Sequence, residues 1–281
     1  MSDISVISLE KNISIFKGLL PNASKMVEIF KEAEINPEST FLFKDWRDWS
    51  RFGTYVWQIG NNLDRTEDLS SNQKYIEEES IVKELHHAFG YATNKYLEER
   101  GLKVGDDWVV MGPSISKYDH LNYEKNLSGI KDLEMLYHTD YVTLEKDWPG
   151  NKFILTCTMY LNDDYEGGDI TFRLPNKQII DYKPKAGDVL VFPSGHPDLL
   201  SENGKYLHGV KSIKNSNKYL VRCFYQKPFA GNPEWLENEK KYGKDIWMKM
   251  EKERIEKEND ELNKLYAEEL SKSVKVDVDG I

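Results

Sequence analysis

Short apolar runs separated by turn residues occupy the chain from Trp108 to about Gln226. The runs are WVVMGPSISKY, FILTCTMYL, DITFRL, DVLVFP, YLHGVKSI and KYLVRCFYQ. Gly, Pro, Asn and Asp fall between them, as in EGG before Asp169 and PKAGD at 184–188. Runs of this length, with such turns between them, predict a sandwich or barrel of β-strands.

Helical spacing marks the residues before these strands. NASKMVEIFKEAE, at 22–34, has apolar residues three and four apart. SIVKELHHAFGYATNKYLEERG is predicted to be a helix from a capping Ser80 to Gly101. The aromatic stretch between the two helices, at 41–60, is expected to pack in the core, although it could also line a substrate cleft.

A charged segment with a sparse apolar stripe follows Phe229 and is predicted to be a helix, with Asn232 as its cap and Pro233 at its first position. We therefore expect one catalytic domain over 1–230, divided into a helical part at 1–105 and a strand core at 106–230. The C-terminal helix would occupy 231–272, and residues 273–281 would form a disordered tail.

Charge narrows the choice of partner. The chain has 281 residues, with 38 Lys and Arg against 48 Asp and Glu, and a formal net charge of -10. Such a surface repels phosphate backbones and anionic membranes, so neither nucleic acid nor a membrane is the expected partner. No run approaches the ~18 apolar residues of a membrane span, and the N-terminus does not read as a signal peptide. We expect a cytoplasmic protein, and the sequence favours no particular oligomeric state.

Cys157 and Cys223 are the two cysteines, and both lie within apolar runs. We expect both cysteines to be reduced thiols in the core, rather than to form a disulfide or a zinc site.

A metal site is predicted from the triplet His138-Thr139-Asp140. Residues i and i+2 share a face at a strand end, so His138 and Asp140 can both face one ion. His208, 70 residues after His138 and within a predicted strand, is the preferred third ligand. His196 is a rival, but it lies in a loop rich in Pro and Gly. Two imidazoles and one carboxylate leave three positions open, which suits ferrous iron, O2 and a chelating cosubstrate.

An anionic chelator such as 2-oxoglutarate would balance the positive charge left on the ion. Its far carboxylate would be buried, so a cation and a hydroxyl should lie inside the barrel to receive it. Lys218, which begins a predicted strand, and Tyr160, which shares a polar strand face with Thr156 and Thr158, are the expected groups. Taken alone, Lys218 could also be an ordinary surface lysine, and Tyr160 an ordinary core tyrosine.

Five segments in order, YHTDY, TCTMYLNDDYEGGDITF, KPKAGDVLVFP, YLHGV and NKYLVRCFY, resemble the Fe(II)- and 2-oxoglutarate-dependent dioxygenases of the prolyl 4-hydroxylase-like branch. The resemblance covers about Ile115 to Tyr225. It implies a mainly β fold with flanking α-helices, a double-stranded β-helix (cupin-like jelly roll) with the N-terminal helices packed outside.

The resemblance also implies site residues and cofactors. Iron would be bound by His138, Asp140 and His208, and the distal carboxylate of 2-oxoglutarate by Lys218 and Tyr160. A further tyrosine near the cosubstrate would be Tyr118, although about ten extra residues separate it from the His-x-Asp triplet. O2 would be the co-oxidant, with ascorbate as a candidate reductant.

The activity implied is hydroxylation of a C–H bond, with release of succinate and CO2. A peptidyl residue is the preferred substrate, with proline first. A free amino acid or other small molecule is the close alternative, and a non-catalytic jelly-roll binding protein is the alternative from another class. The segment 119–136 before the metal ligands could be a lid over either substrate.

Arg222 is a further candidate. On a regular strand it shares the inward face with Lys218, Leu220 and Phe224. A hairpin between His208 and Lys218 would place Arg222 across from His208. There it could bind an anionic group of the substrate or the iron-bound carboxylate of the cosubstrate, or instead pair with an acidic residue at the barrel mouth.

Overall fold

The computed structural model describes residues 4–36, 40–42, 45–49, 54–58, 69–121, 133–140, 142–145, 148–174, 178–194, 206–227, 233–250, 253 and 257. Two compact units are formed, one from 1–141 and 153–226 and the other from 142–152 and 227–281. Residues 273–281, the expected tail, lie outside the described part. The division into a domain at 1–230 and a helix at 231–272 stays a prediction.

The larger sheet runs in the order β1-β2-β12-β8-β15-β5-β4-β3, with β7 paired to β8. Its strands are β1 (Val6–Glu10), β2 (Ile13–Phe16), β3 (Asp45–Trp49), β4 (Thr54–Gln58), β5 (Val109–Tyr118), β7 (Val142–Glu145), β8 (Trp148–Tyr160), β12 (Val189–Pro193) and β15 (Lys218–Lys227). Two of its pairs, β1–β2 and β3–β4, come from residues before 105, where the sequence had predicted helices and core packing.

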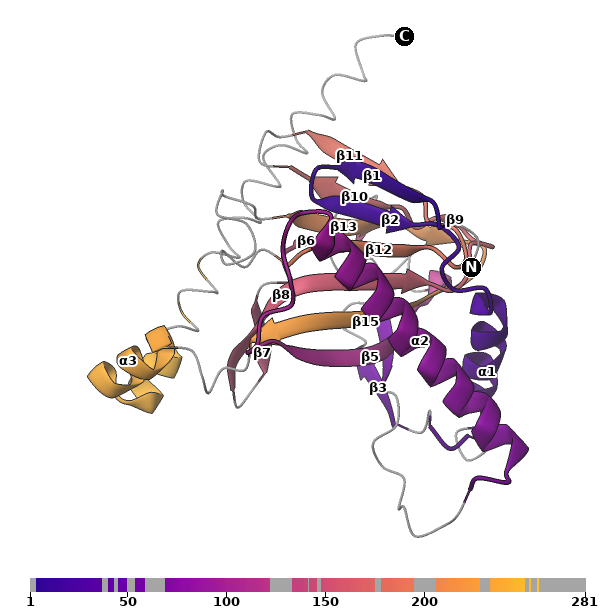
Figure 1. The fold of residues 1–281 in the computed structure, drawn as a ribbon, viewed down its shortest axis with the longest axis horizontal. Coiled ribbons are helices and arrows are strands. Elements are labelled where there is room, and N and C mark those ends of the chain that lie inside the picture. Colours follow the sequence, from indigo (N-terminus) through magenta and orange to yellow (C-terminus); the bar gives the residue numbers. More distant parts are fainter. Residues whose placement is uncertain are drawn as a thin grey trace. The chain divides into compact units, whose positions relative to one another are not determined.

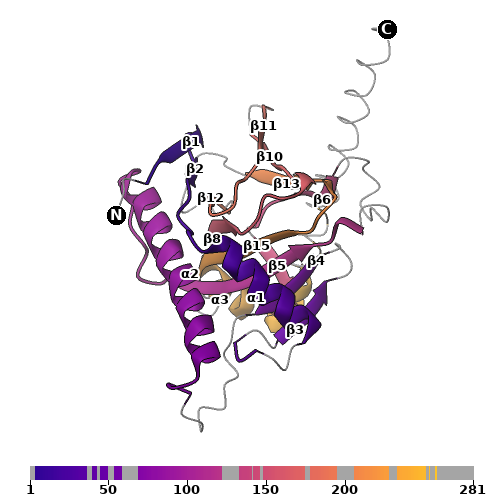
Figure 2. The same cartoon turned by 90° about the vertical axis from the view of Figure 1, so that its right-hand side faces the viewer.

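A smaller antiparallel sheet runs in the order β11-β10-β13-β6. Its strands are β6 (Leu133–His138), β10 (Ile170–Arg173), β11 (Ile179–Tyr182) and β13 (Leu207–Lys211). The short strands β9 (Glu166–Gly167) and β14 (Ile213–Lys214) pair separately. Figures 1 and 2 show the strands of this sheet lying over those of the larger one.

The space between the sheets holds one of two apolar cores. This inner core combines Ile15, Leu190 and Leu220 from the larger sheet with Phe172 and Val210 from the smaller one. Because side chains alternate along a strand, the same strands present their other face to the helices. Two facing antiparallel sheets around a shared interior confirm the predicted jelly roll.

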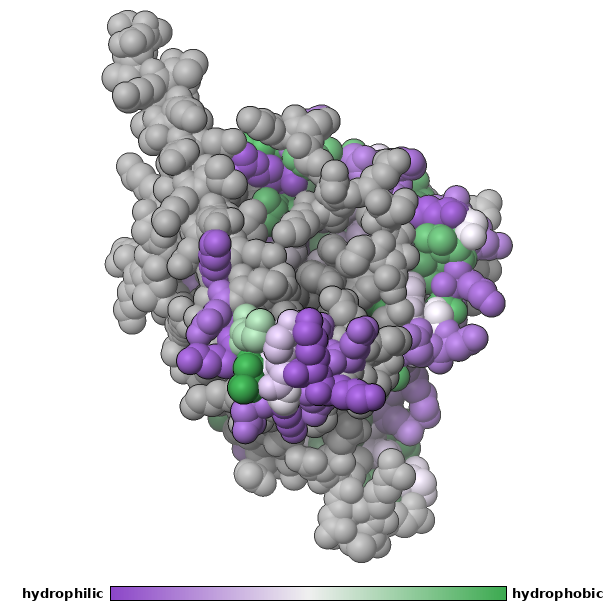
Figure 3. Space-filling model, turned by 90° about the vertical axis from the view of Figure 1, so that its left-hand side faces the viewer, coloured by the Kyte–Doolittle hydropathy of each residue, from purple (hydrophilic) through white to green (hydrophobic). Residues whose placement is uncertain are grey.

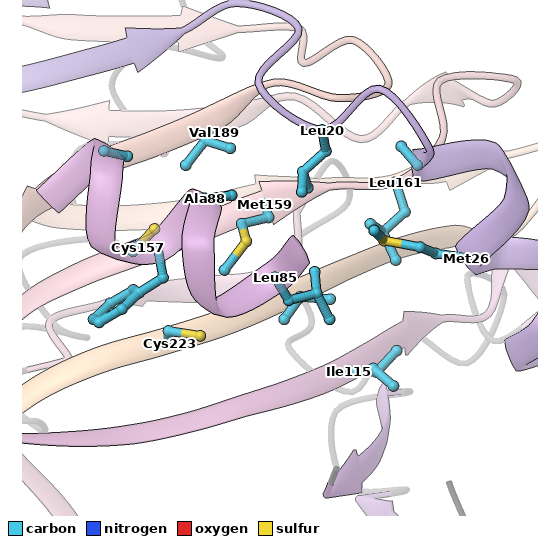
Figure 4. Packing of buried hydrophobic residues seen from close by; sticks show 14 of the residues in the cluster. Leu20, Met26, Leu85, Ala88, Ile115, Cys157, Met159, Leu161, Val189 and Cys223 are labelled. Carbon is cyan, nitrogen blue, oxygen red and sulfur yellow. The ribbon is translucent and has the colours of Figure 1, made fainter. Parts of the chain in front are cut away.

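The second core lies between the larger sheet and the helices α1 (Ala23–Ile35) and α2 (Gln73–Glu98). Figure 4 shows Leu85 and Ala88 of α2 close to Met159, Cys157 and Cys223 of the sheet. The predicted apolar stripe of α2 is confirmed, since all its members are buried: Leu85, Ala88, Phe89, Ala92 and Tyr96. Cys157 and Cys223 are free, buried thiols, as predicted.

The start of α2 differs from the prediction. The helix begins at Gln73, and the side chain of Asn72 accepts hydrogen bonds from the backbone N–H groups of Lys74 and Tyr75. Asn72 is therefore the cap, and Ser80 lies inside the helix. An Asn side chain that accepts hydrogen bonds from the orphan N–H groups of a first turn stabilises the helix start, which explains why the helix begins earlier than predicted.

The second unit contains β7, which pairs antiparallel with the first residues of β8, and the helix α3 (Pro233–Tyr242). Gly243 has a φ of +81° and interrupts the helix, which resumes over 244–250. A left-handed glycine is a common helix end, so the described part of the predicted C-terminal helix consists of two helical segments. The rings of Tyr242 and Trp247 stack across the break, with centroids 6.1 Å apart.

No helix within the described ranges is long and apolar enough to cross a membrane. On the face drawn in Figure 3, hydrophilic side chains cover most of the coloured surface.

Candidate metal and cosubstrate site

The structure brings His138, Asp140 and His208 together. His138 is the last residue of β6, and Asp140 follows two residues later in a turn. His208 lies in β13, which pairs antiparallel with β6 so that His208 is directly opposite His138. Two remote segments therefore place their side chains at one point because their strands are neighbours in the smaller sheet.

The ligand atoms of these three residues all lie within 4.8 Å of one another. Nε2 of His138 is 3.4 Å from Oδ1 of Asp140, and Nε2 of His208 is 3.5 Å from Oδ2. The two imidazole rings have centroids 4.4 Å apart. Among the residues described, this is the group of His, Cys, Asp and Glu whose geometry fits one metal ion.

The protonation states also suit a metal. Burial lowers the pKa of His208 to about 4, against the opposing effect of Asp140, so the imidazole is neutral at pH 7. For Asp140, burial raises the pKa, but His208, His138 and Arg222 together bring it well below its usual range. A neutral imidazole and an ionised carboxylate are the forms that coordinate a divalent ion.

Neighbouring groups orient these ligands. Thr156 of β8 donates a hydrogen bond of 2.9 Å to Oδ2 of Asp140, and its Oγ1 atom lies 2.7 Å from the hydroxyl of Ser194. Nδ1 of His208 is 3.3 Å from the carbonyl oxygen of Tyr206, which leaves Nε2 directed at the other two ligands. Such second contacts fix the tautomer and orientation of metal ligands.

Lys218 lies elsewhere on the same interior face, at the start of β15. Its side chain is fully buried, and Nζ donates a hydrogen bond of 2.6 Å to the carbonyl oxygen of Gly168. Nζ is 5.1 Å from the ring centroid of Tyr160, 5.7 Å from that of Tyr165 and 5.9 Å from that of Tyr118. We call Lys218 and these three tyrosines the lysine–tyrosine cluster.

The double glycine Gly167-Gly168 shapes this cluster. Both residues have positive φ, of +67° and +66°. A Cβ atom on Gly168 would lie 2.7 Å from the ring of Tyr165, and one on Gly167 would collide with the backbone of Ser212. The EGG turn is therefore required for Tyr165 and the Gly168 carbonyl to approach Lys218.

Two hydroxyls of the cluster are buried without partners. Tyr160 is 1% exposed and Tyr165 is 5% exposed, and within the described structure neither Oη atom has a hydrogen-bond partner. Buried polar atoms are rarely left unpaired, so a hydrogen-bond acceptor is missing next to a buried ammonium group. A carboxylate supplies such an acceptor, and the distal carboxylate of 2-oxoglutarate fits this requirement.

Tyr118, the third predicted cosubstrate residue, is buried at the end of β5 and lies opposite Lys218 in the β15–β5 pairing. The insertion before the His-x-Asp triplet therefore does not remove it from the cluster. Whether Tyr118, Tyr160 and Lys218 bind a cosubstrate stays a prediction, as does the role of the three metal ligands.

Arg222 is not where the sequence had placed it relative to His208. His208 pairs with Phe172 and His138 in the smaller sheet, whereas Arg222 pairs with Ser114 of β5 in the larger one. The expected hairpin is therefore wrong, because the chain crosses between the sheets after β13. Arg222 still acts on the metal ligands, since its charge lowers the pKa of both Asp140 and His208.

Two earlier candidates lie outside the described residues, namely His196 and the central part, 122–132, of the predicted lid segment.

Sequence reasoning missed two features of the site, the hydroxyl of Tyr165 and the link from Ser194 through Thr156 to Asp140. An aromatic residue directly before a double glycine was the available signal for Tyr165. No signal along the chain pointed to Ser194, because its contact with Thr156 joins strands that are distant in sequence.

Residues 127–226 match the family model described as the 2OG-Fe(II) oxygenase superfamily. The chain is 25% identical over 144 residues to prolyl 3-hydroxylase 2 of Rattus norvegicus and 24% identical to prolyl 3-hydroxylase 2 of Homo sapiens. Each match covers 46% of this chain and 19% of the relative, so the chain matches about a fifth of the length of these relatives.

The comparison with solved structures finds a likeness to a viral collagen prolyl hydroxylase from Paramecium Bursaria Chlorella virus-1, in complex with 2OG. It has a TM-score of 0.45 and 14% identity, over 78% of this chain and 97% of that chain. A prolyl hydroxylase from Trichoplax adhaerens, in complex with a hypoxia inducible factor peptide fragment, has a TM-score of 0.44 and 15% identity, over 77% and 84% of the two chains.

The family match spans His138, Asp140, His208 and the whole lysine–tyrosine cluster except Tyr118. The donor set also fits the two cofactors that the family's name contains, because one carboxylate and two imidazoles suit Fe(II) and unpaired buried hydroxyls beside a lysine suit 2-oxoglutarate. Residues 127–226 are thus similar in sequence to the 2OG-Fe(II) oxygenase superfamily.

Proposed function

We propose that this protein is an Fe(II)- and 2-oxoglutarate-dependent dioxygenase that hydroxylates a C–H bond of a peptidyl residue, with proline as the first candidate. The reaction consumes O2 and 2-oxoglutarate and releases succinate and CO2, so one oxygen atom enters the substrate and the other enters succinate. The observation that carries the proposal is the convergence of His138, Asp140 and His208, with ligand atoms within 4.8 Å of one another.

The protein's own contribution is binding and orientation. His138, Asp140 and His208 would hold Fe(II), which when bound supplies the activation of O2. Thr156 holds the carboxylate of Asp140 in place by its hydrogen bond. Asp140 and His208 need no proton transfer for this task, since they are already in the forms that bind a metal.

The lysine–tyrosine cluster would bind the distal carboxylate of 2-oxoglutarate. Lys218 supplies the positive charge, and the unpaired hydroxyls of Tyr160 and Tyr165 supply hydrogen bonds. The aromatic rings around the ammonium group exclude water, which strengthens each of these interactions.

The preference for a peptide over a small molecule is supported by the names of the relatives, which are prolyl hydroxylases. A free amino acid would need the same metal and cosubstrate residues. Mass spectrometry of candidate peptides and cell metabolites after incubation with the enzyme, Fe(II) and 2-oxoglutarate separates the two by which molecule gains one oxygen.

The test of the activity itself has two stages. Anaerobic addition of Fe(II) and 2-oxoglutarate should give a weak visible charge-transfer band, and air should then produce succinate. His208→Ala should abolish both, whereas His87→Ala, at an exposed position on α2, should leave both unchanged. A wild-type protein with no band and no succinate would instead be a non-catalytic binding protein.

A further inference from the structure

Arg222 lies on the interior face of β15. Tyr219, Val221, Cys223 and Tyr225 belong to the core beneath the helices, so the alternation along the strand puts Lys218, Leu220, Arg222 and Phe224 on the opposite face. Leu220 is a member of the inner core between the sheets, which agrees with this orientation. Arg222 thus points into the same interior as Lys218.

The neighbouring strand β8 shows which part of the interior Arg222 faces. The N–H of Leu161 donates to the carbonyl of Tyr219, and at the other end Phe153 stacks on Phe224 with ring centroids 4.3 Å apart. Residue numbers decrease along β8 in the direction in which they increase along β15, so the two strands run antiparallel. The contact of Leu161 with Tyr219 therefore places Tyr160 level with Leu220, next to Lys218, and places Thr158, two residues from the Thr156 that binds Asp140, level with Arg222.

The position of Arg222 is fixed by its backbone. Its carbonyl oxygen lies opposite Gly112, where φ is +99° and where an added Cβ would lie 2.7 Å from that oxygen. The β15–β5 register shifts directly after Arg222. The extra residue of this β-bulge belongs to β5, so β15 keeps its regular alternation at Arg222, and bulges are common next to active sites.

The guanidinium of Arg222 acts on the carboxylate of Asp140 through its charge but forms no ion pair with it. Among the described residues it forms no ion pair, and its buried Nε atom has no hydrogen-bond partner. A buried donor without a partner is costly, more so in a charged group. The arrangement therefore lacks an acceptor at this end of the strand, as it does at the lysine–tyrosine cluster.

Lys218 and Arg222 are four residues apart, about 13 Å between their Cα atoms on a regular strand. A molecule of 2-oxoglutarate has two carboxylates, and the proposed function assigns one to Lys218 and the other to the metal ligands. No carboxylate of the cosubstrate would then remain for Arg222, which leaves Arg222 for a second ligand.

Charge indicates the chemistry of that ligand. The two charges of Fe(II), Lys218 and Arg222 together exceed by one the negative charge of Asp140 and a bound dicarboxylate. An additional carboxylate would balance the site and would accept two hydrogen bonds from a guanidinium in its preferred bidentate geometry.

We propose that Arg222 binds a carboxylate of the substrate, next to the carbon that is oxidised. The substrate class is therefore a carboxylate-bearing molecule, either a peptide with an acidic residue beside the hydroxylated one or a small carboxylic acid such as a free amino acid. This inference rests on the proposed function, since it assumes a cosubstrate between Lys218 and the metal ligands.

The experiment measures binding without turnover, by calorimetry of the protein loaded anaerobically with Fe(II) and 2-oxoglutarate. The probes are acetyl-Asp-Pro-amide against acetyl-Asn-Pro-amide, and L-proline against L-prolinamide, so that each pair differs by one carboxylate. The wild type should prefer the acid of one pair by roughly 10- to 100-fold, the usual effect of a charged hydrogen-bonded pair. The pair of probes in which the acid is preferred shows whether the substrate is a peptide or a small molecule.

Arg222→Gln should lose this preference, Arg222→Lys should retain part of it, and both should bind 2-oxoglutarate as the wild type does. Lys211→Gln, which removes a cation from an exposed ion pair with Asp181, is the matched control and should change nothing. The inference is overturned if the wild type shows no acid preference, if Arg222→Gln keeps it, or if the loss falls on 2-oxoglutarate.

A failure of the proposed function gives a different pattern. In that case Fe(II) and 2-oxoglutarate do not bind, whereas the acid preference of the metal-free protein and its loss in Arg222→Gln can still be measured.

Discussion

His208 faces His138 directly across the antiparallel pair of β13 and β6, with the two imidazole rings 4.4 Å apart. Strand pairing thus creates the predicted metal site. Because the register of a strand pair sets which side chains lie opposite, a slip of one residue would turn His208 to the other face of the sheet.

Thr156→Val should weaken metal binding while leaving the fold intact. Valine has the shape of threonine but cannot donate the 2.9 Å hydrogen bond to Asp140, so the carboxylate loses its orientation. Loss of such an outer contact typically lowers metal affinity by roughly 10- to 100-fold. Competition with a chelator measures the Fe(II) affinity. Thr158→Val, on the same strand face but without a bond to Asp140 among the described contacts, should have little effect.

Tyr165→Phe should raise the dissociation constant of 2-oxoglutarate by roughly 10-fold or more, since one hydrogen bond to a carboxylate is lost. Titration of the charge-transfer band with 2-oxoglutarate gives this constant. Tyr219→Phe, on the helix-facing side of β15, is the control. An unchanged constant in Tyr165→Phe would show that the buried hydroxyl does not reach the cosubstrate.

The depressed pKa of His208 should make the metal-free protein less stable in acid. In the unfolded chain this imidazole binds a proton near pH 6.5, whereas in the fold it does so at about 4. Between these values the unfolded state binds more protons, so the free energy of unfolding should fall as the pH falls, by on the order of 3 kcal/mol. Urea denaturation at pH 7 and 4.5 measures it.

His208→Gln removes this titration and should show a smaller fall over the same range. Equal slopes for the variant and the wild type would assign the pH dependence to other groups.

Asp188 should be a major determinant of stability. Its buried carboxylate accepts from Nζ of Lys17, the hydroxyl of Tyr182 and the backbone N–H of Lys185, and so joins β2, β11 and the turn before β12. Asp188→Ala leaves these donors unpaired and should cost about 3–5 kcal/mol of unfolding free energy. Denaturant unfolding measures this, with far-UV circular dichroism to confirm the fold.

The control for Asp188 is Asp181→Asn, which breaks an exposed ion pair with Lys211 and should cost less than about 1 kcal/mol. A similar cost for both variants would mean that Asp188 contributes no more than a surface charge.

The sequence alone determined the fold class and predicted the three candidate metal ligands that the structure brings together. Apolar runs of strand length predicted β5, β8, β10, β12, β13 and β15, since alternation and turn residues are local properties. The triplet His138-Thr139-Asp140 was recognisable because two ligands two residues apart share a strand face. The strands β1 to β4 were not predicted. They form the local pairs β1–β2 and β3–β4, and these pairs join the larger sheet through the later strands β12 and β5.

Tertiary structure decided the rest of the site. The buried position of Tyr165 beside Lys218 depends on the EGG turn, and the contact from Ser194 through Thr156 to Asp140 depends on which strands are neighbours. The sheet that contains Arg222 also depends on where the chain crosses after β13. Periodicity along a chain indicates which side chains share a face, but only the packing of the two sheets determines what each face meets.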